Sequence, residues 1–323
     1  MPPSLELRAV SKRFGSHWAV RGVSLAVPQG AFYSLLGPSG CGKTTTLRLV
    51  AGFEEPEAGE VLLAGRRLNG RPPYERNVST VFQNYALFPH LTVRRNIEFG
   101  LRHNGRLARA EVERRVAGVI ELVQLAGKED RRPHEISGGE RQRVALARSL
   151  VVEPGVLLLD EPLSALDPAL RRQVRGELKA LQRRVGITFL LVTHDQEEAL
   201  SLSDTIAVMR AGAIEQAGPP EDLYLRPRTR FVASFLGSVN WIGAAGIRPE
   251  ATRLSRQDPG DGVRSVEATI ASALFLGHCI RVEARLPTGE TVAAEVPREE
   301  AAYRPGDRVH VWWRPAEELC FEE

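Results

Sequence analysis

A nine-residue segment, GPSGCGKTT at residues 37–45, sets the strongest constraint on how this chain can fold. It matches the pattern G-x-x-x-x-G-K-[ST] and lies between the apolar run AFYSLL and the helical pattern TTLRLVAG. In that setting glycines let successive backbone N–H groups curl around phosphate oxygens, while Lys43 reaches the β- and γ-phosphates and Thr44 offers a hydroxyl to Mg²⁺. The segment predicts a nucleotide-binding loop between a strand and a helix, made of Gly37, Pro38, Ser39, Gly40, Cys41, Gly42, Lys43, Thr44 and Thr45.

Short apolar runs alternate with longer helical patterns through the first two thirds of the chain. Valines at positions 112, 116, 119 and 123 line one face of a predicted helix at 108–126, and a second helix is predicted at 169–185. Apolar strands between helices are typical of a mostly parallel sheet covered on both faces. We therefore expect an α/β domain over residues 1–236, with strands at 5–10, 31–36, 155–160, 187–194 and 204–209.

After about residue 236 the pattern changes to strict alternation of apolar and polar residues. The runs at 280–286, 292–296 and 309–313 alternate in this way, and the turn sequences PTGE and RPGD join them. Residues 237–323 are therefore predicted to form a small all-β barrel or sandwich.

Composition excludes several classes of protein. The hydrophobic share of 43% and charged share of 26% are those of a soluble globular protein, and no apolar run approaches the ~18 residues of a membrane helix. Net charge is +3, with 10 Arg against 14 Asp and Glu after residue 236, which is well short of a nucleic-acid-binding stripe. Three cysteines at unrelated spacings and a start without a signal-peptide core favour free thiols in the cytoplasm.

The run VLLLDEP at 156–162 is an apolar strand that ends in two acids. A carboxylate at that position beside a phosphate loop can hold Mg²⁺, which is the role predicted for Asp160, and Glu161 can orient or deprotonate the attacking water. Both motifs together indicate a P-loop NTPase, a class that includes kinases, GTPases, helicases and motors.

A third segment, ISGGERQRVALARSL at 136–150, places two glycines at the start of a predicted helix. Val144, Ala147 and Leu150 fall at helical spacing, and Ser137 is a suitable capping residue. The unpaired N–H groups of a helix N-terminus suit a phosphate, but a capped surface helix would have the same sequence.

Six motifs now stand in order: GPSGCGKTT, VFQNYALFPH (81–90), ISGGERQRVALARSL, VLLLDEP, SALD (164–167) and LLVTHD (190–195). This set closely resembles the ATP-binding subunit of ABC transporters, over essentially all of residues 4–236. In that family two ATPase domains sandwich two ATP molecules. The resemblance implies that Ser137, Gly138 and Gly139 contact the γ-phosphate held by the partner chain, and that a homodimer completes each site.

The resemblance also assigns further roles by position. Catalysis would involve Glu161, His194 and Gln83, with His194 contacting the γ-phosphate and Gln83 linking Mg²⁺ and water to the membrane subunits. Phe14 falls where the family stacks a ring on adenine, Trp18 is a weaker candidate for that ring, and Asp167 would lie at the dimer seam. The implied cofactors are ATP and Mg²⁺, the latter bound by Thr44, Gln83 and Asp160.

Residues 237–323, which open with GSVNWI and contain GIRPE, resemble the OB-like (TOBE) barrel of importer ATPases for polyamines, iron, sulfate and sugars. The phrases around 121–154 and 177–200 look most like spermidine/putrescine import ATPases. Ferric iron, phosphonate, sulfate and sugar importers remain alternatives, as do an ABC ATPase acting on nucleic acid or ribosomes and a regulatory nucleotide-binding module. The resemblance to importer ATPases implies that the partners are two integral membrane permease subunits and a solute-binding protein, and that nucleic acid is not a partner. It also implies a peripheral position on the cytoplasmic side of the membrane.

The segment ISGGE at 136–140 corresponds to the signature motif of ABC transporters. The commonest form of that motif has Gln where this chain has Glu140. A carboxylate would repel a nearby phosphate, so it should point away from the nucleotide. We hypothesise that Glu140 turns towards Arg141, Arg143 or solvent.

Overall fold

The computed structural model describes residues 3–103, 107–300 and 303–321. It divides into two compact units, Met1–Pro220 and Glu221–Glu323. The helices α7 (Pro220–Leu225) and α8 (Arg230–Leu236) therefore belong almost entirely to the second unit. The sequence-based boundary between 1–236 and 237–323 stays a prediction.

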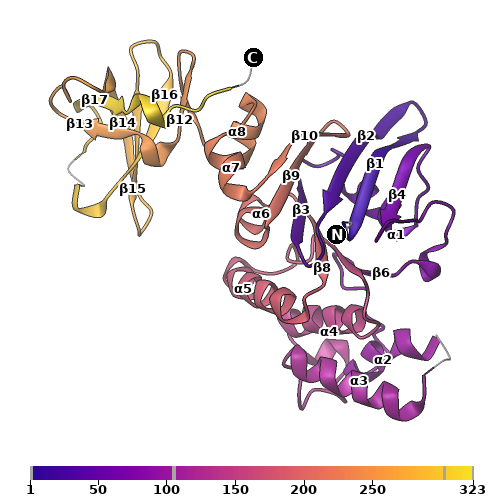
Figure 1. The fold of residues 1–323 in the computed structure, drawn as a ribbon. Helices are drawn as coiled ribbons and strands as arrows, with labels where there is room; N and C mark the ends of the chain where they lie inside the picture. Colours follow the sequence, from indigo (N-terminus) through magenta and orange to yellow (C-terminus); the bar gives the residue numbers. More distant parts are fainter. Residues whose placement is uncertain (1–2, 104–106, 301–302, 322–323) are drawn as a thin grey trace. The chain divides into compact units, whose positions relative to one another are not determined.

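The first unit is built around a six-stranded sheet in the order β10-β9-β3-β8-β7-β6 (Figure 1). All neighbouring strands in it are parallel except β9 and β10. Every residue of β3 and β8 is buried, as near-continuous apolar runs predict. The predicted parallel sheet is thus confirmed, with β3 (Phe32–Leu36), β6 (Val78–Val81), β7 (Val156–Asp160), β8 (Thr188–Thr193), β9 (Thr205–Arg210) and β10 (Ala213–Gly218).

A second, antiparallel sheet in the first unit has the order β2-β1-β4-β5. The strand predicted at 5–10 lies here, within β1, and not in the parallel sheet. Leu5, Leu7 and Val10 bury one face of it while intervening residues are more exposed, and such alternation suits a sheet with one solvated face. The strands are β1 (Leu5–Phe14), β2 (His17–Val27), β4 (Ala58–Leu63) and β5 (Arg66–Arg67).

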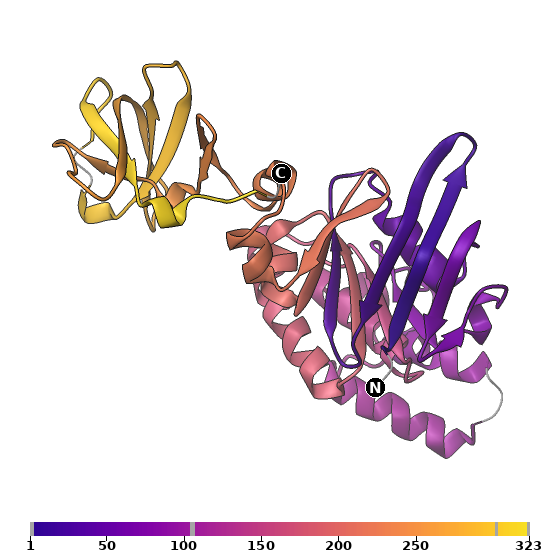
Figure 2. The same ribbon diagram turned by 45° about the horizontal axis from the view of Figure 1, so that its top comes forward.

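Six helices complete the described part of the first unit. The predicted helices at 108–126 and 169–185 are confirmed as α3 and α5. Helices α2, α3 and α4 lie side by side in both views and enclose an apolar cluster that includes Ile97, Val116 and Val144 (Figures 1 and 2). The helices are α1 (Lys43–Ala51), α2 (Val93–His103), α3 (Arg109–Leu122), α4 (Gly138–Leu150), α5 (Pro168–Val185) and α6 (Gln196–Leu202).

The second unit contains a five-stranded antiparallel sheet in the order β13-β17-β14-β15-β16. Strands β13 and β16, at opposite ends of that order, lie against each other, so the sheet curls towards a barrel around Val282, Ala294 and Val311. The predicted alternation is confirmed, and the predicted turns join β15 to β16 and β16 to β17. The strands are β11 (Asn240–Ile242), β12 (Ala245–Ile247), β13 (Arg253–Ser255), β14 (Arg264–Phe275), β15 (Ile280–Arg285), β16 (Thr291–Val296) and β17 (Arg308–Trp313).

Five short 3-10 turns complete the described elements, at Pro73–Glu75, Pro133–Glu135, Pro249–Ala251, Arg298–Glu300 and Pro315–Glu317. Within the described ranges, no helix has the length and apolar character needed to cross a membrane.

Candidate functional site

The phosphate loop connects β3 to α1 and depends on glycine at two close contacts. A Cβ on Gly37 would lie 2.4 Å from the carbonyl oxygen of Met209, and one on Gly42 would lie 2.2 Å from that of Ala19. Gly42 also has a φ of 107°, which L-residues rarely adopt. Both glycines therefore hold the loop tightly against β9 and β2.

Lys43 is buried at the start of α1 with its side chain turned back along the loop. Its Nζ donates to the carbonyl oxygens of Gly37 at 2.7 Å and Pro38 at 2.9 Å, and lies 3.8 Å from Cys41 Sγ. Burial raises the pKa of the Cys41 thiol, so it stays protonated near neutral pH. Ser39 and Gly40 are exposed at the loop tip, and Thr45 is partly exposed.

Asp160 ends β7 next to the phosphate loop, as the sequence predicts. Thr44 Oγ1 donates to Asp160 Oδ1 at 3.4 Å, so two of the three side chains predicted to bind Mg²⁺ lie together. Burial raises the pKa of Asp160, and the adjacent charge of Glu161 raises it further. A cation beside this carboxylate would relieve both effects.

Glu161 contacts residues of two other segments, one that contains Gln83 and one that contains Val192 and His194. Its Oε1 lies 3.0 Å from His194 Nδ1, and its Oε2 accepts from Gln83 Nε2 at 3.5 Å. Its backbone has a φ of 46° and its N–H donates to the Val192 carbonyl oxygen at 2.9 Å, which ties the turn to β8. The His194 side chain is 55% exposed and that of Glu161 only 21%, so the carboxylate is sheltered while the imidazole faces solvent.

The start of α4 is a capping box. Ser137 Oγ accepts from the backbone N–H of Glu140 at 3.2 Å, and Glu140 Oε2 accepts from the backbone N–H of Ser137 at 2.7 Å. Glu140 also pairs with Lys128 at 3.4 Å. The hydrogen bond from the Ser137 backbone N–H is the largest cause that lowers the pKa of Glu140, and the Ser137 side chain and Lys128 lower it further.

The expected partners of Glu140 were therefore wrong. The carboxylate turns to the Ser137 backbone and to Lys128, because the N3 position of a helix lies within reach of the capping N–H. Arg143 instead pairs with Glu177 of α5 at 2.7 Å.

Three other residues with predicted roles lie at the start of α5 and on the β1–β2 hairpin. Asp167 caps α5 by accepting from the backbone N–H groups of Ala169 and Leu170. Phe14 and Trp18 are exposed on the β1–β2 hairpin, and their exposed fractions are 47% and 42%. Trp18 immediately precedes Ala19, the residue that contacts Gly42 of the phosphate loop.

One contact near His194 was not predicted. Arg171 Nη1 donates to Asp195 Oδ2 at 3.2 Å and its Nη2 donates to the Leu166 carbonyl oxygen at 3.1 Å. It therefore joins the SALD segment to the residue after His194. The sequence signal was weak, since it consists only of an arginine one turn beyond the capping Asp167.

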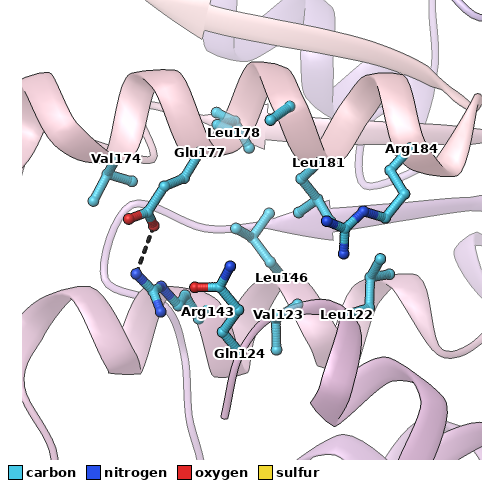
Figure 3. A pocket seen from close by; sticks show the side chains of 11 residues that line it. Leu122, Val123, Gln124, Arg143, Leu146, Val174, Glu177, Leu178, Leu181 and Arg184 are labelled. Carbon is cyan, nitrogen blue, oxygen red and sulfur yellow. Dashed lines mark hydrogen bonds and ion pairs between the residues drawn. The ribbon is translucent and has the colours of Figure 1, made fainter.

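An apolar cleft of about 140 Å³ lies between α3, α4 and α5 (Figure 3). Leu146, Leu178 and Leu181 line it, and the Arg143–Glu177 ion pair spans one side. None of the predicted catalytic or phosphate-binding residues lines this cleft, so it is separate from the chemistry.

Along the chain, a tight phosphate loop is followed by a capped helix that begins with two glycines, and then by an acid pair whose Glu161 contacts His194 and Gln83. This combination is that of an ABC-type ATPase. Family models agree with that class: "ABC transporter" matches residues 20–164 and "TOBE domain" matches residues 245–321. The chain belongs to the ATP-binding subunits of ABC transporters, and it is an ATP-hydrolysing enzyme of that family.

Among curated relatives, the chain is 48% identical to the spermidine/putrescine import ATP-binding protein PotA of Rubrobacter xylanophilus, with 97% of this chain and 92% of the relative covered. Identity to the protein of the same name in Bacillus cereus is 45%, with 99% of each chain covered. In Methylococcus capsulatus it is 59%, over 73% of this chain and 61% of the relative.

Solved structures resemble the ATPase part of the chain. An ATP-binding cassette solved as a dimer in a post-hydrolysis state bound to ADP and Pi is 30% identical, with a TM-score of 0.58, and covers 67% of this chain and 98% of its own. The protein cbiO1 of Clostridium perfringens, part of an ABC transporter complex, is 27% identical with a TM-score of 0.63, covering 69% of this chain and 91% of its own.

Proposed function

We propose that this chain hydrolyses ATP in a homodimer to drive import of spermidine or putrescine through two membrane permease subunits, on the cytoplasmic side of the membrane. The substrate class is supported by relatives over nearly the whole chain whose names specify polyamine import. The same names favour transport over action on nucleic acid or ribosomes. A solute-binding protein would deliver the polyamine to the permease subunits.

The phosphate loop would hold the ATP phosphates through its backbone N–H groups and the ammonium of Lys43. Oxygen donors of Thr44, Asp160 and Gln83 suit Mg²⁺, which prefers hard oxygen ligands and supplies charge neutralisation of the phosphates when bound. The fit rests on the placement of these donors, since Thr44 Oγ1 lies 3.4 Å from Asp160 Oδ1 and a second carboxylate, Glu161, follows directly. The raised pKa of Asp160 agrees with a cation at this position.

Glu161 would orient the attacking water and accept its proton. The observation that carries this role is the 3.0 Å contact between Glu161 Oε1 and His194 Nδ1, with Gln83 at the other carboxylate oxygen. His194 would hold the carboxylate in place and contact the γ-phosphate. Because Glu161 sits in a strained turn bonded to β8, its orientation is fixed before ATP binds.

The partner's signature helix would complete each site. Ser137, Gly138 and Gly139 of one copy would face the γ-phosphate held by the loop of the other, and Asp167 would lie at the seam. Phe14 or Trp18 would stack on adenine. Loss of the γ-phosphate would then remove the bridge between the two copies.

Uptake by the full complex in proteoliposomes tests the proposal. ATP inside the vesicles should drive accumulation of labelled spermidine or putrescine when the binding protein is supplied outside. Accumulation of ferric iron, phosphonate, sulfate or sugar with no polyamine uptake would refute the substrate class. ATP turnover without any permease association, together with binding to nucleic acid, would refute transport.

A further inference from the structure

The turn that follows Gln83 is held in an unfavourable backbone conformation. Tyr85 and Ala86 have φ values of 62° and 45°, in the left-handed region that glycine occupies most easily. Residues other than glycine keep this strained conformation only where their surroundings hold it. The Tyr85 hydroxyl is also buried and, among the described residues, has no hydrogen-bond partner. This turn therefore depends on contacts from outside its own segment.

Arg148 of α4 provides those contacts. Its Nη1 donates to the Ala86 carbonyl oxygen at 2.6 Å and its Nη2 donates to the Tyr85 carbonyl oxygen at 2.8 Å. The guanidinium also lies 5.8 Å from the centre of the Phe88 ring. Burial lowers the pKa of Arg148, because it removes water from the guanidinium. The two charge-assisted hydrogen bonds to the strained peptides offset part of that loss of solvation.

Helix α2 holds the chain two residues after this turn, at Phe88. Asn96 Oδ1 accepts from the Phe88 N–H at 2.9 Å, and Asn96 Nδ2 donates to the Phe88 carbonyl oxygen at 3.1 Å. Asn96 is completely buried. The turn is therefore bonded to α4 directly and to α2 through Phe88, and it cannot shift relative to α4 without breaking the Arg148 bonds.

The two ends of α4 have different neighbours. Its N-terminus carries Gly138 and Gly139, which the proposed function places at the partner's γ-phosphate, and Arg148 lies in its last turn. Gln83, two residues before Tyr85, contacts Glu161. A 13-residue helix is a rod of about 20 Å, so a displacement at the glycine end is carried to the turn through Arg148.

We propose that Arg148 is a positioning residue that makes α4 and the Tyr85–Ala86 turn move as one body. It thereby couples engagement of the γ-phosphate to the apolar loop that follows Gln83. This role rests on the proposed function, to which it adds that the loop at residues 85–89 contacts the permease subunits. Two strained residues and an unpaired hydroxyl make the turn the part of this connection that is easiest to rearrange once Arg148 is removed.

Hydrogen exchange on the full-length chain tests the first half of the proposal. In Arg148→Met, the Tyr85 amide, which donates to the Phe82 carbonyl oxygen at 2.9 Å, should exchange at least tenfold faster, while amides of β3 and β8 keep their protection. Arg143→Met is the matched control, because Arg143 lies on the same helix but pairs with Glu177. Equal exchange rates of the Tyr85 amide in wild type and Arg148→Met would show that Arg148 does not hold the turn, and would overturn the proposal.

Turnover by the reconstituted complex tests the second half. The basal ATPase rate of Arg148→Met should stay within about twofold of the wild-type rate. Its permease-stimulated ATPase rate and its uptake rate should each fall at least tenfold. Arg148→Lys retains the charge but cannot donate to both carbonyl groups in the same way, so its stimulated rate should lie between those of the wild type and Arg148→Met. It replaces Arg148→Met in the test if that variant fails to fold. Adding Ala86→Gly to Arg148→Met should recover part of the stimulated rate, because glycine accepts the positive φ without strain.

The outcomes separate the two proposals. A wild-type complex without permease stimulation or polyamine uptake refutes the proposed function and the coupling role, while the exchange data still decide whether Arg148 holds the turn. A stimulated wild type with equally stimulated Arg148→Met refutes the coupling alone. Equal loss of basal and stimulated rates would place Arg148 in general stability, and that result also overturns the proposal.

Discussion

Replacing Glu161 with Gln is expected to stop hydrolysis while leaving ATP bound. The amide has the shape of the carboxylate, and its oxygen can still accept from His194 Nδ1, 3.0 Å from the present Oε1. It cannot accept a proton from water. General-base catalysis contributes about 10²- to 10⁴-fold, so kcat should fall by that factor, which corresponds to about 2.7–5.5 kcal/mol at 1.36 kcal/mol per tenfold.

The phosphate loop is untouched by this change, because Lys43 bonds to Gly37 and Pro38 and not to Glu161. The Kd for ATP should therefore change less than about threefold, and ATP should hold the variant as a dimer in size-exclusion chromatography. Phosphate release measured under saturating ATP gives kcat. Glu177→Gln, a carboxylate change in the α4–α5 ion pair, is the control and should retain near-normal turnover.

Two results would refute this reasoning. Wild-type kcat in Glu161→Gln would show that the carboxylate is not the base. A large loss of kcat with a proportional weakening of ATP affinity would show that the change disturbed binding geometry instead of the chemical step.

Three further changes probe other parts of the chain. Lys43→Ala should weaken ATP affinity at least 100-fold in equilibrium binding, and unchanged affinity would contradict its place in the phosphate site. Glu140→Gln tests a pH dependence: the folded pKa of Glu140 lies below its ordinary value of 4.5, so its stabilisation is present above that value and is lost as pH falls through the folded pKa. Urea unfolding should show a deficit of about 0.5–1 kcal/mol at pH 7 that disappears in acid; an equal deficit at both pH values argues against a charge effect. Arg248→Met should lower the unfolding free energy of the second unit by about 2–4 kcal/mol, since Arg248 donates to four buried or partly buried backbone carbonyls, and a deficit below 0.5 kcal/mol would rule out that role.

Features set by local chemistry could be predicted from sequence. The phosphate loop, the buried strand before it and the helix after it all lie within residues 31–51, although the carbonyl groups that require glycine at two of its positions belong to Ala19 and Met209. The Ser137 cap is likewise a matter of four consecutive residues. The strand at 5–10 was predicted but not its sheet, because its partners β2 and β4 depend on non-local pairing that an alternating pattern does not specify.

Contacts between long side chains and distant backbone carbonyls could not be predicted. Arg148 reaches carbonyl groups 62 and 63 residues away. Every residue has a carbonyl, so the acceptor leaves no mark in the sequence, and the strain at Tyr85 and Ala86 is invisible until the backbone is known. The same holds for Arg171 and the Leu166 carbonyl, although the arginine itself was in plain sight.

The capping box resolves the difficulty posed by a carboxylate in the signature. Glu140 takes the Ser137 N–H, and Ser137 Oγ takes the Glu140 N–H, which leaves the N–H groups of Gly138 and Gly139 without an acceptor in the described part of the chain. Those two donors have no Cβ in front of them and sit at the positive end of α4. Glu140 therefore does not compete with a phosphate for the same donors. Its charge is also offset by Lys128 at 3.4 Å, so a glutamate here is compatible with an anion held by the two glycines.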